Sequence, residues 1–150
     1  MLKINLLATI VMVTILSSCG FHTPYTNLTI NASIISNRNN IFANELQKHF
    51  NQNMHKILVI QVGAENQNQR TVSYTSSNEA SSYTLKLSIP IKVFNHNKKL
   101  LLSKTFSANT YLSKIDAYQA NRLQIEEGYQ QLRRLIIKQL LRRLYNLNEN

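Results

Sequence analysis

The sequence has 150 residues, of which 17 are lysine or arginine and 7 are aspartate or glutamate, so its formal net charge is +10. A chain of this length suits one domain with a modest core. Its single cysteine excludes a disulfide within the chain, and its three glycines do not form the glycine-rich loops of the recognised phosphate-binding motifs. Composition therefore argues against nucleotide-dependent chemistry.

Residues 1–18 are predicted to be a cleaved signal peptide. Lys3 precedes an apolar run of about a dozen residues, whereas a helix needs about 20 residues to cross a bilayer. Residues 16–19 (LSSC) resemble the lipobox of bacterial lipoproteins. The resemblance implies that Cys19 becomes an N-acylated, S-diacylglyceryl N-terminus and that residues 19–26 form a lipidated tether. The alternative is a signal peptide with an incidental cysteine.

The predicted anchor narrows the choice of partners. Gly20 follows Cys19 where an aspartate would resemble the inner-membrane retention signal of enteric bacteria, which favours the periplasmic side of the outer membrane. Removal of residues 1–18 takes away only the charge of Lys3, so the mature charge falls from +10 to +9. A protein with this positive net charge attracts anions. Acidic headgroups and phosphorylated glycolipids are compatible with an exported protein, whereas nucleic acid is not expected as a partner.

The first half of the mature chain predicts a strand, a helix and a second strand. Residues 27–32 are strand-like, residues 41–53 have helical periodicity, and residues 56–64 are rich in isoleucine and valine. The apolar face of the helix comprises Phe42, Leu46 and Phe50, and its candidate N-caps are Asn37, Asn39 and Asn40. Residues 65–70 are polar and are compatible with a bulge, a turn or an exposed part of a long strand. Strand-like residues 71–75 and a loop at 76–82 follow.

A long hairpin is predicted next. Apolar residues alternate with polar residues from 83 to 93, a second apolar face runs from 100 to 112, and residues 95–99 (NHNKK) connect them. Lys104 interrupts the second apolar face. Pro90 cannot donate to a ladder, so we expect it at a sheet edge or a bulge.

A long amphipathic helix is predicted to begin near Ser113, which has capping-box spacing to Asp116. Basic residues Arg134, Lys138 and Arg142 form a row toward its C-terminal end, and Gly128 is a weak point within it.

These elements predict one α+β domain over residues 27–150. The expected architecture is a two-layer sandwich in the order β-α-β-β-β-α, with about four strands in a mixed sheet and two helices on one face. The first two strands would pair in parallel through a crossover.

Residue types favour binding over catalysis. The four histidines, His22, His49, His55 and His96, lack metal-ligand spacing, and only Glu126 and Glu127 are adjacent carboxylates. No catalytic residue, metal site or cofactor is predicted. Lys86, Lys92 and Lys104 could form a cationic sheet surface; the alternative is that they are solvated lysines that protect an exposed sheet. The basic row of the last helix (Arg134, Lys138 and Arg142) is likewise interpreted as solvated residues that need no ligand.

Three segments carry a family resemblance: residues 19–22 (CGFH), residues 83–87 (YTLKL) and residues 139–144 (QLLRRL). They resemble the LptE family, the lipopolysaccharide-assembly lipoproteins of Gram-negative outer membranes. The order of predicted elements also matches. No single segment is specific, but together they are similar to the family across nearly the whole mature chain.

The resemblance implies a non-enzymatic protein that occupies the LptD β-barrel as a plug, assists its assembly and binds lipopolysaccharide. It implies further ligand candidates at Lys114 or Arg122, which align loosely with a family lysine near the last helix. The family's basic residue in the loop before the third strand has no counterpart in residues 76–82. An adaptor or pilotin-type lipoprotein of another envelope machine is the alternative, and an envelope enzyme is a weaker third possibility.

Overall fold

The computed structural model describes residues 31–148 except 38, 52 and 54. Its elements are β1 (Ala32–Ser36), α2 (Ile41–Gln47), β2 (Leu58–Val62), β3 (Asn66–Tyr74), β4 (Ala80–Asn95), β5 (Leu100–Ser113) and α3 (Tyr118–Asn148). The predicted first strand began at residue 27, outside the described part, and the observed strand runs four residues past its predicted end.

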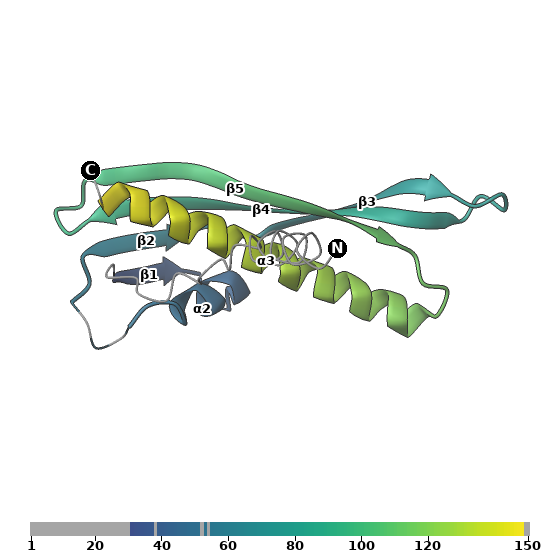
Figure 1. The fold of residues 1–150 in the computed structure, drawn as a ribbon, viewed down its shortest axis with the longest axis horizontal. Helices are drawn as coiled ribbons and strands as arrows, with labels where there is room; N and C mark the ends of the chain where they lie inside the picture. Colours follow the sequence, from purple (N-terminus) through teal and green to yellow (C-terminus); the bar gives the residue numbers. More distant parts are fainter. Residues whose placement is uncertain (1–30, 38, 52, 54, 149–150) are drawn as a thin grey trace, which may run out of the picture.

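A single mixed sheet is organised around β4, its longest strand (Figure 1). β5 pairs with β4 along one side. On the other side, β2 pairs with the C-terminal part of β4 and β3 pairs with the N-terminal part. β1 pairs in parallel with β2, as predicted, from Ala32 opposite Leu58 to Ser36 opposite Val62.

The sheet has five strands, where about four were predicted, because β2 and β3 are two halves of one interrupted edge of β4. The interruption lies at Gly63, whose N–H donates to the carbonyl of Pro90 over 2.9 Å. Since a strand residue directs its N–H and C=O to the same neighbour, the missing N–H of Pro90 faces this interruption. Val62 pairs with Ile91 and Asn66 pairs with Ser88, so the three residues 63–65 lie opposite only two, Ile89 and Pro90. Pro90 is therefore in a central strand, not at an edge, and it lies at a bulge, the other position predicted for it.

The same contact explains the glycine at position 63. A Cβ built there would lie 2.6 Å from Cγ of Pro90 and 3.2 Å from its carbonyl oxygen. Beyond the interruption, polar residues 66–70 form strand β3, so the exposed-strand interpretation of residues 65–70 is the correct one apart from Glu65.

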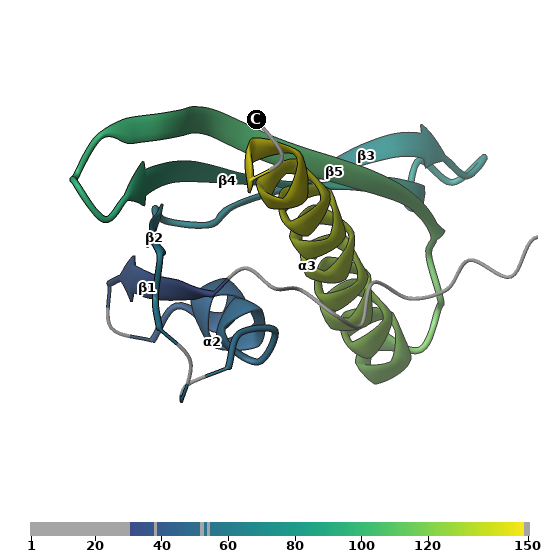
Figure 2. The same ribbon diagram turned by 60° about the vertical axis from the view of Figure 1, so that its left-hand side comes forward.

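Both helices cover one face of the sheet, and the other face is open (Figure 2). This confirms the predicted two-layer α+β sandwich. The core lies between the layers and takes alternate residues of the strands, including the completely buried Ile60, Leu85, Leu87 and Ile89. From the helices it takes Phe42, Leu46, Leu132, Ile136, Leu140 and Leu144.

α2 begins where predicted and ends earlier, at Gln47 rather than 53. Asn40 is its N-cap, and the Asn40 side chain accepts from the N–H of Ala43 at 3.0 Å. After Gln47 the backbone turns more tightly, because His49 donates to Leu46 and Phe50 donates to Gln47, both three residues back. This tighter turn still brings Phe50 into the core at 6% exposure.

α3 begins at Tyr118, so the predicted capping box of Ser113 and Asp116 is wrong. Ser113 is instead the last residue of β5, where it pairs with Ser82 of β4. Close packing explains the glycine at position 128, the predicted weak point of this helix. A Cβ there would lie 2.7 Å from Cδ1 of Leu85 and 3.3 Å from Cδ1 of Leu112, so glycine permits the helix to approach the sheet closely.

Candidate functional site

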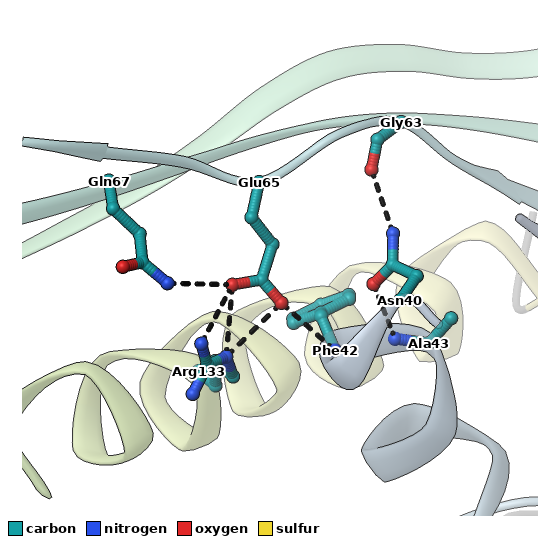
Figure 3. Close-up of polar contacts among 7 residues, drawn as sticks. All are labelled: Asn40, Phe42, Ala43, Gly63, Glu65, Gln67 and Arg133. Carbon is teal, nitrogen blue, oxygen red and sulfur yellow. Dashed lines mark hydrogen bonds and ion pairs between the residues drawn. The ribbon is translucent and has the colours of Figure 1, made fainter. Parts of the chain in front are cut away.

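A buried ion pair joins the two layers at the break between β2 and β3 (Figure 3). Nε of Arg133, on α3, donates to both carboxylate oxygens of Glu65 at 3.1 and 3.0 Å, and Nη2 donates to Oε2 at 2.9 Å. The two side chains are 6% and 13% exposed. Because both charges are nearly removed from water, each depends on the other for compensation.

Glu65 also satisfies the start of α2. Its Oε1 accepts from the N–H of Phe42 at 3.0 Å, while Asn40 accepts from Ala43 and donates through its amide to the carbonyl of Gly63 at 3.0 Å. One carboxylate thus connects α3, the β2–β3 junction and α2. This cluster is structural, since its polar atoms are directed at one another rather than at a ligand (Figure 3).

The open face of the sheet carries part of the predicted cationic surface. Lys86 and Lys92 are exposed and alternate with buried β4 residues, so they point away from the helices. They are six residues apart on one strand, a separation of about 20 Å at roughly 3.3 Å per residue. The two lysines therefore cannot hold one small anion together.

Arg70 on β3 is a cation that the sequence prediction missed. Asn68 lies directly opposite Lys86, and Arg70 lies opposite Thr84, so Arg70 is the diagonal neighbour of Lys86 on the open face. Diagonal neighbours on a sheet are about 7–8 Å apart, within reach of two long side chains. The periodicity of residues 66–70 would have predicted this position only if the polar segment had been read as a strand.

This part of the open face has no negative charge to neutralise it. None of the five strands contains aspartate or glutamate. Asn68 and Asn109 flank Lys86 on the neighbouring strands and offer amide hydrogen-bond donors. We call Arg70, Lys86 and these two asparagines the open-face cationic cluster. It can bind an anion such as a phosphate through several charge-assisted hydrogen bonds.

The structure separates Lys104 from the other predicted sheet cations. Lys104 pairs directly with the buried Ile91, and directly paired residues share a face, so Lys104 belongs to the helix-covered side of the sheet. There its ammonium lies 5.4 Å from the ring centroid of Phe106. A continuous surface of Lys86, Lys92 and Lys104 is therefore not formed.

Lys114 and Arg122 lie elsewhere and have acidic partners. Nζ of Lys114 lies 3.7 Å from Glu79, in the turn between β3 and β4. Nε of Arg122 lies 3.3 Å from Glu126, one helical turn further along α3. Neither joins the open-face cationic cluster, and Cys19 lies outside the described residues.

Other chemistry has little support in the described part of the chain. Residues 31–148, apart from the three gaps, contain no group of three histidine, cysteine, aspartate or glutamate residues placed to hold a metal ion. In the same residues, no helix is both long and apolar enough to span a membrane. Burial raises the pKa of the Tyr129 phenol above its usual value of 10.0, which keeps this core group protonated.

Fold and surface together define a class: a small two-layer α+β domain with helices on one face and a polar, cation-bearing sheet on the other. Comparison with known proteins makes this specific. The family model described as "LptE: Lipopolysaccharide-assembly" matches residues 28–146. The chain therefore belongs to the LptE family of lipopolysaccharide-assembly lipoproteins.

Solved structures have the same fold. Rare lipoprotein B of Shewanella oneidensis is 11% identical with a TM-score of 0.68, covering 80% of this chain and 97% of that chain. Uncharacterized lipoprotein B of Nitrosomonas europaea is 16% identical with a TM-score of 0.63, covering 83% and 90%. A putative lipoprotein from Caulobacter crescentus is 10% identical with a TM-score of 0.58, covering 78% and 90%. A search of curated proteins finds no match.

Proposed function

We propose that this chain is an outer-membrane lipoprotein that complexes with the LptD β-barrel. In this role it is a plug and an assembly factor, it binds lipopolysaccharide, and it helps to deliver it to the outer leaflet. The family match over residues 28–146 carries the proposal. The lipobox supports a periplasmic-side anchor at Cys19, and the role requires no catalytic group or cofactor.

The open-face cationic cluster supports direct binding of a phosphorylated glycolipid. Lipid A phosphates are anionic, and Arg70 and Lys86 offer two cations that no described carboxylate pairs. Arginine can contact two phosphate oxygens at once, and lysine adds a second charge. We assign these two residues as ligand contacts before Lys92, which is about 20 Å away, and before Lys114 and Arg122, which have acidic partners.

A binding experiment tests this assignment. Replacement of both cations (Arg70→Gln with Lys86→Gln) should weaken binding of purified protein to lipopolysaccharide, with a reduced dependence on salt. Lys104→Gln is the control for each single variant, Arg70→Gln or Lys86→Gln, because it also removes one exposed cation from the sheet but from the other face. Equal affinity of the double variant and the wild type would assign the cluster to solubility.

A depletion experiment separates the proposed role from an adaptor or pilotin role. Loss of the protein should reduce surface lipopolysaccharide while secretion machines remain assembled. Normal surface lipopolysaccharide together with a missing secretin or other envelope machine would favour the adaptor or pilotin instead.

A further inference from the structure

We infer that the end of the domain where the tether enters is a membrane-docking surface for anionic phospholipid headgroups. This inference rests on the proposed anchor at Cys19. It adds an orientation for the anchored protein before it enters the barrel: the domain then stands on the membrane by this end and does not hang freely from its tether.

Hydrogen bonds fix the N-terminal end of the described chain at one end of the sheet. Asn31 is the first described residue, and its carbonyl accepts from the N–H groups of Ile57 and Leu58 at 3.1 and 3.3 Å. Its side-chain amide donates to the carbonyl of Asn51 at 2.7 Å. Leu58 in turn pairs with Asn95, the last residue of β4. Asn31, the segment before β2 and the β4–β5 turn therefore meet at one end of the sheet.

That end is strongly basic. The exposed lysines of these loops are Lys48, Lys56, Lys98 and Lys99, which we call the anchor-end basic cluster. His49, His55 and His96 are exposed in the same loops. No aspartate or glutamate occurs in residues 46–64 or 80–115, so the loops contain no charge of opposite sign. An anionic surface is the complementary partner.

The β4–β5 turn holds two of these lysines in a defined position. Asn95 is bonded to both ends of the turn: its N–H donates to the carbonyl of Lys99, and its side-chain oxygen accepts from the N–H groups of Asn97 and Lys99. Lys98 has a φ of 60°, a left-handed conformation that asparagine or glycine adopts more readily. Leu100, at the start of β5, is 50% exposed and adds an apolar contact beside the turn.

The tether makes weak docking effective. Eleven residues lie between Cys19 and Asn31, and the twelve steps from one to the other span at most about 40 Å when extended. The lipid anchor therefore holds the anchor-end basic cluster close to the headgroups at a high effective concentration. Since each lysine near an anionic surface favours binding about fivefold, a few lysines suffice to orient an anchored domain.

In this orientation, the long axis of the sheet is directed away from the membrane. β4 runs from the anchor end toward the turn at residues 75–79, and its 16 residues correspond to about 50 Å at roughly 3.3 Å per residue. The β3–β4 turn would then project away from the membrane, at the other end of the long axis (Figure 1).

Site-specific labels test the orientation in the full lipidated protein. The chain has one cysteine, whose sulfur the lipid would block, so Asn97→Cys and Ser77→Cys each supply one reactive thiol, at the anchor end and in the β3–β4 turn. A fluorophore at either position is measured in vesicles that carry a headgroup-attached quencher. The vesicles contain phosphatidylcholine alone or phosphatidylcholine with phosphatidylglycerol.

We expect quenching at position 97 only with phosphatidylglycerol, relief of that quenching by high salt, and no quenching at position 77. Changing Lys56, Lys98 and Lys99 together to glutamine should lower the ratio of docked to undocked protein about 100-fold. The control carries Lys104, Lys114 and Arg122 changed to glutamine, which removes the same charge elsewhere. It should leave the ratio within about twofold, because even Lys104, opposite Ile91, is about 13 Å along the strand from Asn95, beyond a Debye length of about 10 Å.

Equal quenching at position 97 in both vesicle types would overturn docking by anionic phospholipid, as would equal quenching at positions 97 and 77. Quenching that requires added phosphorylated glycolipid would reassign the cluster to that ligand. Protein that fails to float with the vesicles would overturn the anchor together with this inference. Failure of docking in protein that does float would leave the proposed function standing.

Discussion

Removal of one charge of the buried ion pair should lower the free energy of unfolding more than removal of both charges. Glu65→Gln leaves the charge of Arg133 at 6% exposure without a counterion, and Arg133→Met leaves the Glu65 carboxylate at 13% exposure. Breaking a buried pair from one side costs about 3–5 kcal/mol. We expect each single variant to lose about 3 kcal/mol of unfolding free energy.

The double variant, Glu65→Gln with Arg133→Met, removes both charges and keeps the hydrogen bond to α2. A glutamine at position 65 can still accept from the N–H of Phe42, so the helix start remains satisfied. We expect a loss of about 1 kcal/mol, smaller than that of either single variant, because neutral replacements of buried pairs are often tolerated. Equilibrium urea unfolding followed by circular dichroism measures all three variants.

A matched surface pair provides the control. Arg122 and Glu126 form an i, i+4 pair at 61% and 57% exposure, and Arg122→Met should cost only a few tenths of a kcal/mol. A double variant whose loss equals the sum of the two single losses would refute the reasoning, because the two charges would then not compensate each other.

Three further changes test the fold. Gly63→Ala should cost about 1–3 kcal/mol in urea unfolding, because its Cβ would lie 2.6 Å from Cγ of Pro90; an unchanged midpoint would contradict this. Asn40→Ala should cost about 1–2 kcal/mol through the lost cap of α2, and Asn40→Ser should recover part of it. For Tyr129, the raised pKa means that its contribution to stability is fully present below pH 10.0 and is lost as pH rises through the folded-state pKa. Tyr129→Phe lacks this loss, so parallel alkaline profiles of wild type and variant would disprove it.

Local pattern was sufficient for the architecture. The strict alternation of residues 83–93 predicted β4, and residues 95–99 predicted the hairpin turn. The spacing of Phe42, Leu46 and Phe50 predicted the buried side of α2 and of the turn that follows it. These signals come from periods of two or about 3.6 residues, which a single segment contains. The order of the predicted strands and helices along the chain then gives two layers with both helices on one face of the sheet.

Features that depend on contacts between distant segments were not predictable in this way. The break between β2 and β3 arises because Gly63 meets Pro90, 27 residues later in the sequence. The end of β5 at Ser113 depends on its pairing with Ser82, and this pairing overrides the local capping signal. Periodicity gives spacing along one segment but not register between segments.

The candidate site shows the same division. Lys86 and Lys92 could be placed on the polar face of β4 from alternation alone. The partnership of Arg70 with Lys86 requires the β3–β4 register, as does the separation of Lys104 from them. Arg133 did carry a local signal, since it lies on the apolar stripe of α3 between Tyr129 and Ile137, both buried. An arginine in such a position indicates a buried acidic partner, here Glu65.

The proposed complex with a β-barrel is the central claim, and isolation of the protein from its membrane tests it most directly. Tagged full-length protein is purified from gently solubilised outer membranes, and the mass of the complex is determined. We expect a one-to-one complex with a large β-barrel protein of the LptD type. A solitary monomer, recovered under conditions that keep other outer-membrane complexes intact, would contradict it.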